Sequence, residues 1–199
     1  PVLVLMLLNA TMWLIANFIV YTYLAELLER VTHLADSAIS GMIFLFGLAS
    51  VLGNALGGYG ADRWGATRML VIGMIGLAIA FLVLPWASVT VWGVAIVLVV
   101  WGVFGWMLMT PQQHRLIALS PQSANIVLSL NGSALYIGSG TGAIVGGLTL
   151  RFFSVQALGW VGGTITLLAL VVLFVCLRAT SVARLTEQQA EILREEAVA

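Results

Sequence analysis

The stretch Gly57-Gly58-Tyr59-Gly60-Ala61-Asp62-Arg63-Trp64-Gly65-Ala66-Thr67-Arg68 sets four glycines and three charged residues between two long apolar runs. The glycines at 58, 60 and 65 permit a tight reversal and close helix approach, because they carry no side chain. The charges of Asp62 and Arg63 fit a boundary with water. Asp62 precedes the second apolar run, so it can cap that helix, where a negative charge is favourable. The stretch therefore predicts a polar reversal between two helices.

The composition around this stretch excludes an ordinary soluble domain. The 199 residues are 61% hydrophobic and 8% charged, and the mean hydropathy is +1.09. A soluble domain carries about 25% charged residues. The net charge is zero, so no basic patch indicates nucleic acid as a partner. The lone Cys176 excludes an internal disulfide and a cysteine-built metal site, and we expect no metal or cofactor.

Six apolar runs are long enough to cross a bilayer as helices. They are Val2–Leu28, Ala38–Tyr59, Met69–Pro85, Val89–Thr110, Ala124–Leu150 and Ala157–Leu177. The segment Pro111–Ser123 is predicted to be a polar loop. The sequence thus predicts an all-α membrane protein of six transmembrane helices in residues 1–178, followed by a tail at 179–199. Because the chain opens with Pro1 and lacks a basic leader, we expect a fragment or a trimmed chain, not a cleavable signal.

Arginines are divided unevenly between the two predicted sides of the membrane. The side with both termini holds Arg63, Arg68, Arg115, Arg178, Arg184 and Arg194, and the opposite side holds Arg30 and Arg151. Arginine-rich loops stay in the cytoplasm, so both termini are predicted to be cytoplasmic in a multi-pass inner or plasma membrane protein. Trp86, Trp92 and Trp160 then fall at the outer interface, where such rings are enriched.

The tail differs in composition from the spans, with two arginines and four glutamates in residues 180–199. Val182, Leu185, Gln189 and Ile192 recur at helical spacing, which favours a short amphipathic helix. An acidic helix suits the anionic inner leaflet poorly. We therefore favour a solvated, partly disordered cytoplasmic tail.

The quoted stretch resembles the loop signature of the major facilitator superfamily, G-x-x-x-D-R-x-G-x-x-R/K, which joins the second and third helices on the cytoplasmic side. Gly58, Asp62, Arg63, Gly65 and Arg68 occupy its defined positions. The resemblance implies that these residues form a conformational gate. The alternative, a helix cap beside a positive-inside arginine, is less favoured.

Further segments resemble the C-terminal half of drug- and sugar-efflux members of this superfamily. Phe18–Ala25 is similar to the opening helix of that half, and Gly142–Gly147 resembles the end of the antiporter motif, G-P-x-x-G-G. Ala143 replaces the proline, which suits the repeat-related helix of the second half. Complete members have twelve spans in two six-helix halves. We therefore expect one half of this fold, the C-terminal one.

Two stripes on the fifth predicted span indicate that a half needs a neighbour. Asn125, Ser129, Ser133 and Tyr136 form a polar stripe, and Gly138, Gly142, Gly146 and Gly147 lie in a run of small residues. Small residues at four-residue spacing permit close helix packing in lipid, where exposed polar groups are costly. The expected partner is an N-terminal six-helix half or a second copy of this chain. The resemblance implies that the second and fifth spans make the contact.

The first and fourth spans should line the central cavity, by the same resemblance. Asn9, Trp13, Asn17 and Tyr21 recur every four residues along the first span. Trp13 and Trp101 both lie about 15–17 Å into their spans, near the bilayer midplane. These five residues are the predicted substrate-binding set, with the tryptophans as an aromatic platform. Large packing residues are the alternative interpretation for each tryptophan alone.

No enzyme emerges from the sequence. Ser139 suggests an intramembrane serine protease, but no histidine lies in any predicted span to act as its base. Glu26 is the one acid inside an apolar run, and its place near the outer end favours an interfacial carboxylate over a proton relay. Two function classes stay open. One is a secondary transporter, or half of one, that moves a small organic solute such as a drug or sugar by alternating access, with or without proton coupling; the other is a non-transporting membrane subunit.

Overall fold

The computed structural model describes the backbone of residues 2–198 and the side chains of residues 2–180. Its helices are α1 (Val2–Tyr21), α2 (Leu24–Arg30), α3 (Asp36–Trp64), α4 (Ala66–Ala87), α5 (Val91–Trp106), α6 (Met109–Leu119), the short 3-10 helix Pro121–Ser123, α7 (Ala124–Phe152) and α8 (Ala157–Val198). Within the described range, six helical stretches are long and apolar enough to span a membrane. The prediction of six membrane-crossing helices is confirmed.

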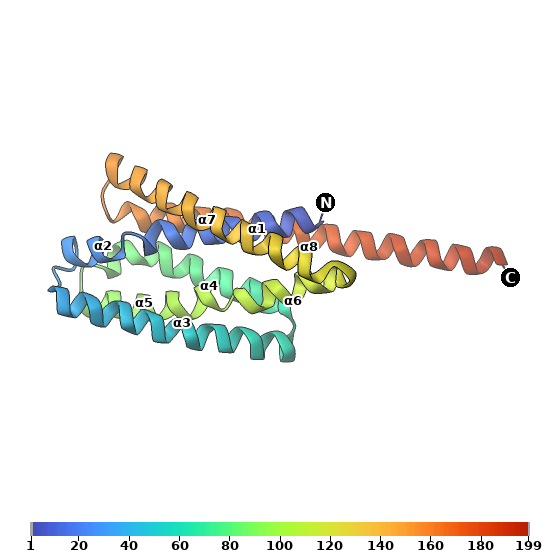
Figure 1. Cartoon of the computed structure of the whole chain (residues 1–199), viewed down its shortest axis with the longest axis horizontal. Coiled ribbons are helices and arrows are strands. Elements are labelled where there is room, and N and C mark those ends of the chain that lie inside the picture. Colours follow the sequence, from blue (N-terminus) through green and yellow to red (C-terminus); the bar gives the residue numbers. More distant parts are fainter. Residues whose placement is uncertain (1, 199) are drawn as a thin grey trace.

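The long helices run side by side in one bundle (Figure 1). Neighbouring contacts run in the order α7, α1, α8, α4, α5 and α3. The two helices at the ends of this series, α3 and α7, are buried over only 22% of their most apolar segment, against 61% for α4. The faces left open therefore belong mainly to α3 and α7.

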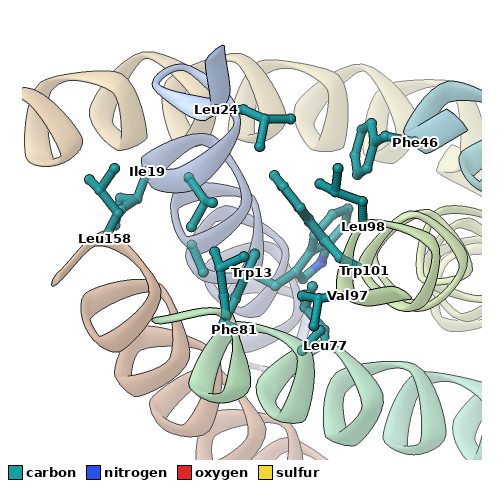
Figure 2. Close-up of a cluster of buried hydrophobic side chains, with 14 of the residues drawn as sticks. Trp13, Ile19, Leu24, Phe46, Leu77, Phe81, Val97, Leu98, Trp101 and Leu158 are labelled. Atoms are coloured by element: carbon teal, nitrogen blue, oxygen red, sulfur yellow. The ribbon is translucent and has the colours of Figure 1, made fainter. Parts of the chain in front are cut away.

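Large apolar side chains fill the centre of the bundle (Figure 2). Trp13 from α1, Phe81 from α4 and Trp101 from α5 are almost completely buried, and Leu158 from α8 closes one side. In lipid, such packing holds helices together mainly by van der Waals contact, because hydrocarbon provides little hydrophobic drive between helices.

Glycines set the close approach of α3 to α5. A Cβ atom at Gly53 would collide with the backbone of Val103, and one at Gly57 would collide with that of Met107. The two glycines are four residues apart on one face of α3, the spacing that lets two helix backbones touch. This contact packs α3 closely against α5, its neighbour at one end of the helix series.

The glycine stripe of α7 packs against α1 of the same chain. A Cβ atom at Gly138 would lie 2.8 Å from Thr11 O, and one at Gly142 would lie 2.6 Å from Ile15 O. Tyr23 covers the end of the stripe. At Gly146 a Cβ would lie 2.7 Å from its ring, and at Gly147 2.7 Å from its hydroxyl. The expectation that this stripe meets a partner is therefore wrong, because α1 already occupies it.

The junction after α3 is shorter than predicted. α3 continues five residues past the predicted end at Tyr59 and stops at Trp64, and α4 begins at Ala66. Gly65 alone breaks the helix, with a φ of 92° that favours glycine. Asp62 therefore lies in the last turn of α3. It does not cap α4, whose N-cap is Gly65 with no side-chain cap bond.

Two spans are interrupted. The first is broken between α1 and α2 at Thr22–Tyr23, and the fourth between α5 and α6 at Met107–Leu108. The predicted polar loop Pro111–Ser123 is mostly helical, because α6 continues to Leu119. Pro111 fits in the first turn of α6, where no backbone donor is needed.

The last helix, α8, continues to Val198 and extends well beyond the bundle (Figure 1). Its backbone is helical where we expected a partly disordered tail. The side chains of 181–198 lie outside the described residues, so the amphipathic pattern stays a prediction. The N-terminus, the α3–α4 junction and the far part of α8 lie toward the same end of the molecule (Figure 1).

Candidate functional site

An open cleft of about 540 Å³ lies where α1, α3 and the end of α5 meet. Its wall is formed by Tyr21, Ile43, Phe44, Phe46, Gly47, Leu48, Ser50, Val51 and Trp106. Small-molecule sites have volumes of roughly 300–1,000 Å³ and mostly apolar walls with a few polar groups. This cleft, which we call the outer cleft, matches that description.

A smaller pocket adjoins it and is called the inner pocket. Its free volume is about 20 Å³, and it is lined by Trp13, Leu14, Asn17, Phe18, Tyr21, Phe46 and Trp106. Tyr21, Phe46 and Trp106 line both spaces. The two spaces therefore form one site with a wide outer part and a narrow inner part.

Asn17 holds the floor of this site in place. Its Oδ1 accepts a hydrogen bond of 2.7 Å from Trp101 Nε1, and its Nδ2 donates one of 3.0 Å to the carbonyl of Trp13. Asn17 and Trp101 are both buried. The amide thus ties α5 to α1, and both of its polar atoms have partners within the bundle.

An aromatic series leads from the buried core to the site. The Trp101 ring lies 5.3 Å from Phe81, 4.5 Å from Phe46 and 6.4 Å from Tyr21, between ring centroids. Tyr21 is 42% exposed, so it ends the series at the surface of the cleft. Edge-on and tilted contacts at these distances are favourable and orient the rings.

The structure brings only part of the predicted substrate-binding set to the site. Trp13, Asn17 and Tyr21 line the inner pocket, and Tyr21 also lines the outer cleft. Asn9 is buried and donates from Nδ2 to the carbonyl of Ala169 at 2.6 Å, which connects α1 to α8. Trp101 stands behind the site and contacts the lining residues Asn17, Phe46 and Tyr21.

Sequence reasoning missed Phe46, Ser50 and Trp106 among the lining residues. Trp106 lies five residues beyond Trp101 in the same cavity-lining span, and this proximity was a usable signal. Phe46 stands in a uniformly apolar run, where no pattern separates a cleft-facing residue from a lipid-facing one.

Charge lies at the two ends of the bundle, away from the lining residues. Near the α2 end, Glu26 pairs with Arg30 at 2.8 Å. Near the other end, Asp62 Oδ1 lies 3.8 Å from His114 Nδ1 on α6. The residues that line the outer cleft and the inner pocket are all uncharged. The site is therefore suited to a neutral or amphipathic molecule.

The predicted gate residues surround the α3–α4 junction. The Asp62 side chain is 73% exposed, and Arg63 Nη1 donates to the Tyr59 hydroxyl at 2.9 Å. Gly65 makes the break, and Arg68 is exposed in the first turn of α4. Gly58 faces α6, where a Cβ atom would lie 3.6 Å from Thr110.

The sequence profile of the Major Facilitator Superfamily matches residues 2–196. The chain therefore belongs to the Major Facilitator Superfamily, a family of membrane transporters and not of enzymes. It is a multi-pass membrane protein whose six spans form one half of that fold.

Curated relatives share this assignment. The chain is 30% identical over 159 residues to the uncharacterized MFS-type transporter YbcL of Bacillus subtilis, covering 80% of this chain and 41% of the relative. It is 30% identical over 135 residues to the inner membrane transport protein YdhP of Escherichia coli K12, covering 68% of this chain and 34% of that protein. A probable sugar efflux transporter of Helicobacter pylori J99 is 25% identical over 172 residues, covering 85% and 43%. The chain thus spans less than half the length of these relatives.

A solved structure confirms the fold. The crystal structure of a D-xylose-proton symporter superimposes with a TM-score of 0.69 at 18% sequence identity. The match covers 96% of this chain and 52% of the symporter. At this identity the likeness shows the fold alone, and it matches the six helices to half of a complete transporter.

Proposed function

We propose that this chain is half of a secondary transporter that moves a small organic solute by alternating access. The observation that carries the proposal is the outer cleft, a space of about 540 Å³ with one exposed tyrosine and a largely apolar wall. It is lined mostly by α3, one of the two poorly buried helices, together with α1 and the end of α5.

The second half is expected to cover the two poorly buried helices, α3 and α7. Asn125, Ser129, Ser133 and Tyr136 are all exposed on α7, and α3 exposes Phe44 and Val51. The hydroxyls of Ser129 and Ser133 donate to carbonyls one turn earlier. Because polar side chains facing hydrocarbon are costly, the rest of the stripe favours protein or water beside α7. The partner proposed is an N-terminal six-helix half, with this chain as the C-terminal half. A second copy related by two-fold symmetry is the other arrangement.

Tyr21, Asn17 and Trp13 are proposed to contact the solute, with Phe46 and Trp106 as further lining residues. Asn9 and Trp101 are proposed to position them from behind. Relatives named as sugar efflux transporters support an uncharged organic solute, such as a sugar or an amphipathic drug, moved outward. The arginine distribution supports an arrangement with both termini in the cytoplasm.

Asp62, Arg63 and Arg68 are proposed to act as a conformational gate at the cytoplasmic end. Asp62 lies near the C-terminal end of α3, where the helix dipole disfavours a negative charge. The Asp62 carboxylate lies 3.8 Å from His114 on α6. A movement of α6 relative to α3 therefore changes the surroundings of this carboxylate and can stabilise it. Such a gain in one conformation and not the other is what a gate requires.

Flux through liposomes tests the proposal. The whole protein that carries this chain would be reconstituted and assayed by counterflow against a panel of radiolabelled sugars and neutral aromatic compounds. Protein-dependent, saturable exchange of one of them is the expected result. Saturable binding without any exchange would instead identify a non-transporting subunit and contradict the proposal.

A further inference from the structure

The indole N–H of Trp13 is a buried donor without a partner. Trp13 is 1% exposed, and its Nε1 has no hydrogen-bond partner among the residues whose side chains the structure describes. Trp101, buried to the same degree, donates its own N–H to Asn17. Leaving a buried donor unsatisfied costs about 1–3 kcal/mol, so an unpaired N–H in a packed core indicates a role that offsets this cost.

Trp13 is one of the residues that line the inner pocket. The pocket's free volume of about 20 Å³ is enough for one water-sized group and too small for a ring. The other polar side chain deep in the lining is Asn17, and both of its polar atoms already have partners. The pocket therefore offers room for a single oxygen-sized group beside the buried, unpaired N–H of Trp13. Tyr21 and Trp106 add further donors where the pocket meets the outer cleft.

We propose that the inner pocket binds a single uncharged oxygen acceptor of the transported solute, a hydroxyl, ether or carbonyl oxygen, through Trp13 Nε1. The body of the solute lies in the outer cleft against Tyr21, Phe46 and Trp106. This inference rests on the proposed function and deepens it, because it names the substrate class and a specificity-determining residue.

Charge discriminates against the other ligand classes. A carboxylate or phosphate also accepts hydrogen bonds, but the lining holds no cation to compensate its desolvation. An ammonium group offers no acceptor to Trp13 and meets no carboxylate in either space. A neutral ring that carries one oxygen substituent satisfies the donor at the lowest cost.

Binding of three probes to the whole protein in lipid nanodiscs tests the inference. The probes are phenyl β-D-glucopyranoside, phenyl phosphate and benzyltrimethylammonium, which share an aromatic ring and differ in charge. Affinities would be measured by calorimetry for the parent, for Trp13→Phe and for Trp92→Phe. The Trp92→Phe variant removes an indole N–H at a residue that is 82% exposed and distant from the site.

The glucoside is expected to bind at least tenfold more tightly than either charged probe. Trp13→Phe should weaken its binding about three- to tenfold, the effect of one hydrogen bond. Trp92→Phe should leave it unchanged. If Trp13→Phe fails to fold, position 13 would instead carry 3-benzothienylalanine, which keeps the bicyclic ring and replaces N–H by sulfur.

Equal glucoside affinity in the parent and the position-13 variant would overturn the inference, and would indicate that the Trp13 N–H does not contact the solute. Equal or tighter binding of a charged probe, or no binding of the glucoside, would also overturn it. Counterflow separates these results from a failure of the proposed function. Exchange that does not change when position 13 is substituted would support transport and contradict the Trp13 contact. Glucoside binding that depends on Trp13, without any exchange, would support the contact and contradict transport.

Discussion

Trp101 on α5 donates its indole N–H to Oδ1 of Asn17 on α1 at 2.7 Å, and this bond joins the two helices beneath the inner pocket. The same amide donates to the carbonyl of Trp13 one turn earlier. The floor of the site is therefore a fixed polar bridge, and the groups left for a ligand lie above it.

This bridge should contribute measurably to stability. Asn17→Ala removes both hydrogen bonds, and Trp101→Phe removes the donor of one. Because the two side chains share a bond, their effects on the free energy of unfolding should be non-additive by about 1 kcal/mol, within the range for interhelical bonds in membranes. Unfolding of both single variants and the double variant in mixed micelles measures this coupling. Strict additivity would show that the bond contributes nothing.

Gly142→Leu should disrupt the chain's own bundle, because α1 fills the space beside this glycine. The matched control is Gly140→Leu on the same helix, where a Cβ atom meets nothing within 4 Å. We expect the first variant to lose its monodisperse peak in size-exclusion chromatography and the second to keep it. If both variants stay equally stable, the α1–α7 contact is not as tight as the structure shows.

Cysteine labelling tests the orientation in the membrane. Val89 and Gln122 are exposed at opposite ends of the bundle, whereas Ser88 is buried and unsuited to labelling. In a Cys176→Ser background, an impermeant maleimide added to intact cells should label Val89→Cys and spare Gln122→Cys. The reverse pattern would place both termini outside.

If Asp62 is the proposed gate residue, Asp62→Asn should reduce transport at least several-fold. The fold should stay intact, because the Asp62 side chain is 73% exposed and not part of the core. Asp36→Asn is the control, since it neutralises an exposed acid at the opposite end of the same helix. Initial rates of counterflow and thermal stability would be compared. Normal transport by Asp62→Asn would contradict the gate role and show that Asp62 is only a charged residue at the membrane boundary.

The membrane class and the six spans could be predicted because a bilayer demands long apolar helices, and runs such as Val2–Leu28 leave no other solution. Helix ends were less certain. Helical backbone costs little at a polar boundary, so α3 runs on to Trp64 and α6 replaces a predicted loop.

Pairing was harder to predict than helix formation. Small residues such as Gly138 and Gly142 signal a close neighbour without stating which helix it is, and the neighbour proved to be α1. Asn9 and Asn17 recur at helical spacing on α1, and both are buried. Only the three-dimensional arrangement separated Asn9, bonded to α8, from Asn17, bonded beside the pocket.

The central claim is that solute passes through the outer cleft, and filling that cleft tests it most directly. Gly47 lines the cleft, and a Cβ atom there meets no described atom within 4 Å, so Gly47→Trp adds bulk to the cleft without disturbing helix packing within this chain. Gly41→Trp is the matched control, because Gly41 is equally open on the same helix and lies outside the lining. Counterflow in proteoliposomes should be lost in Gly47→Trp and retained in Gly41→Trp. Full exchange by a folded Gly47→Trp protein would contradict the claim that the cleft is the path.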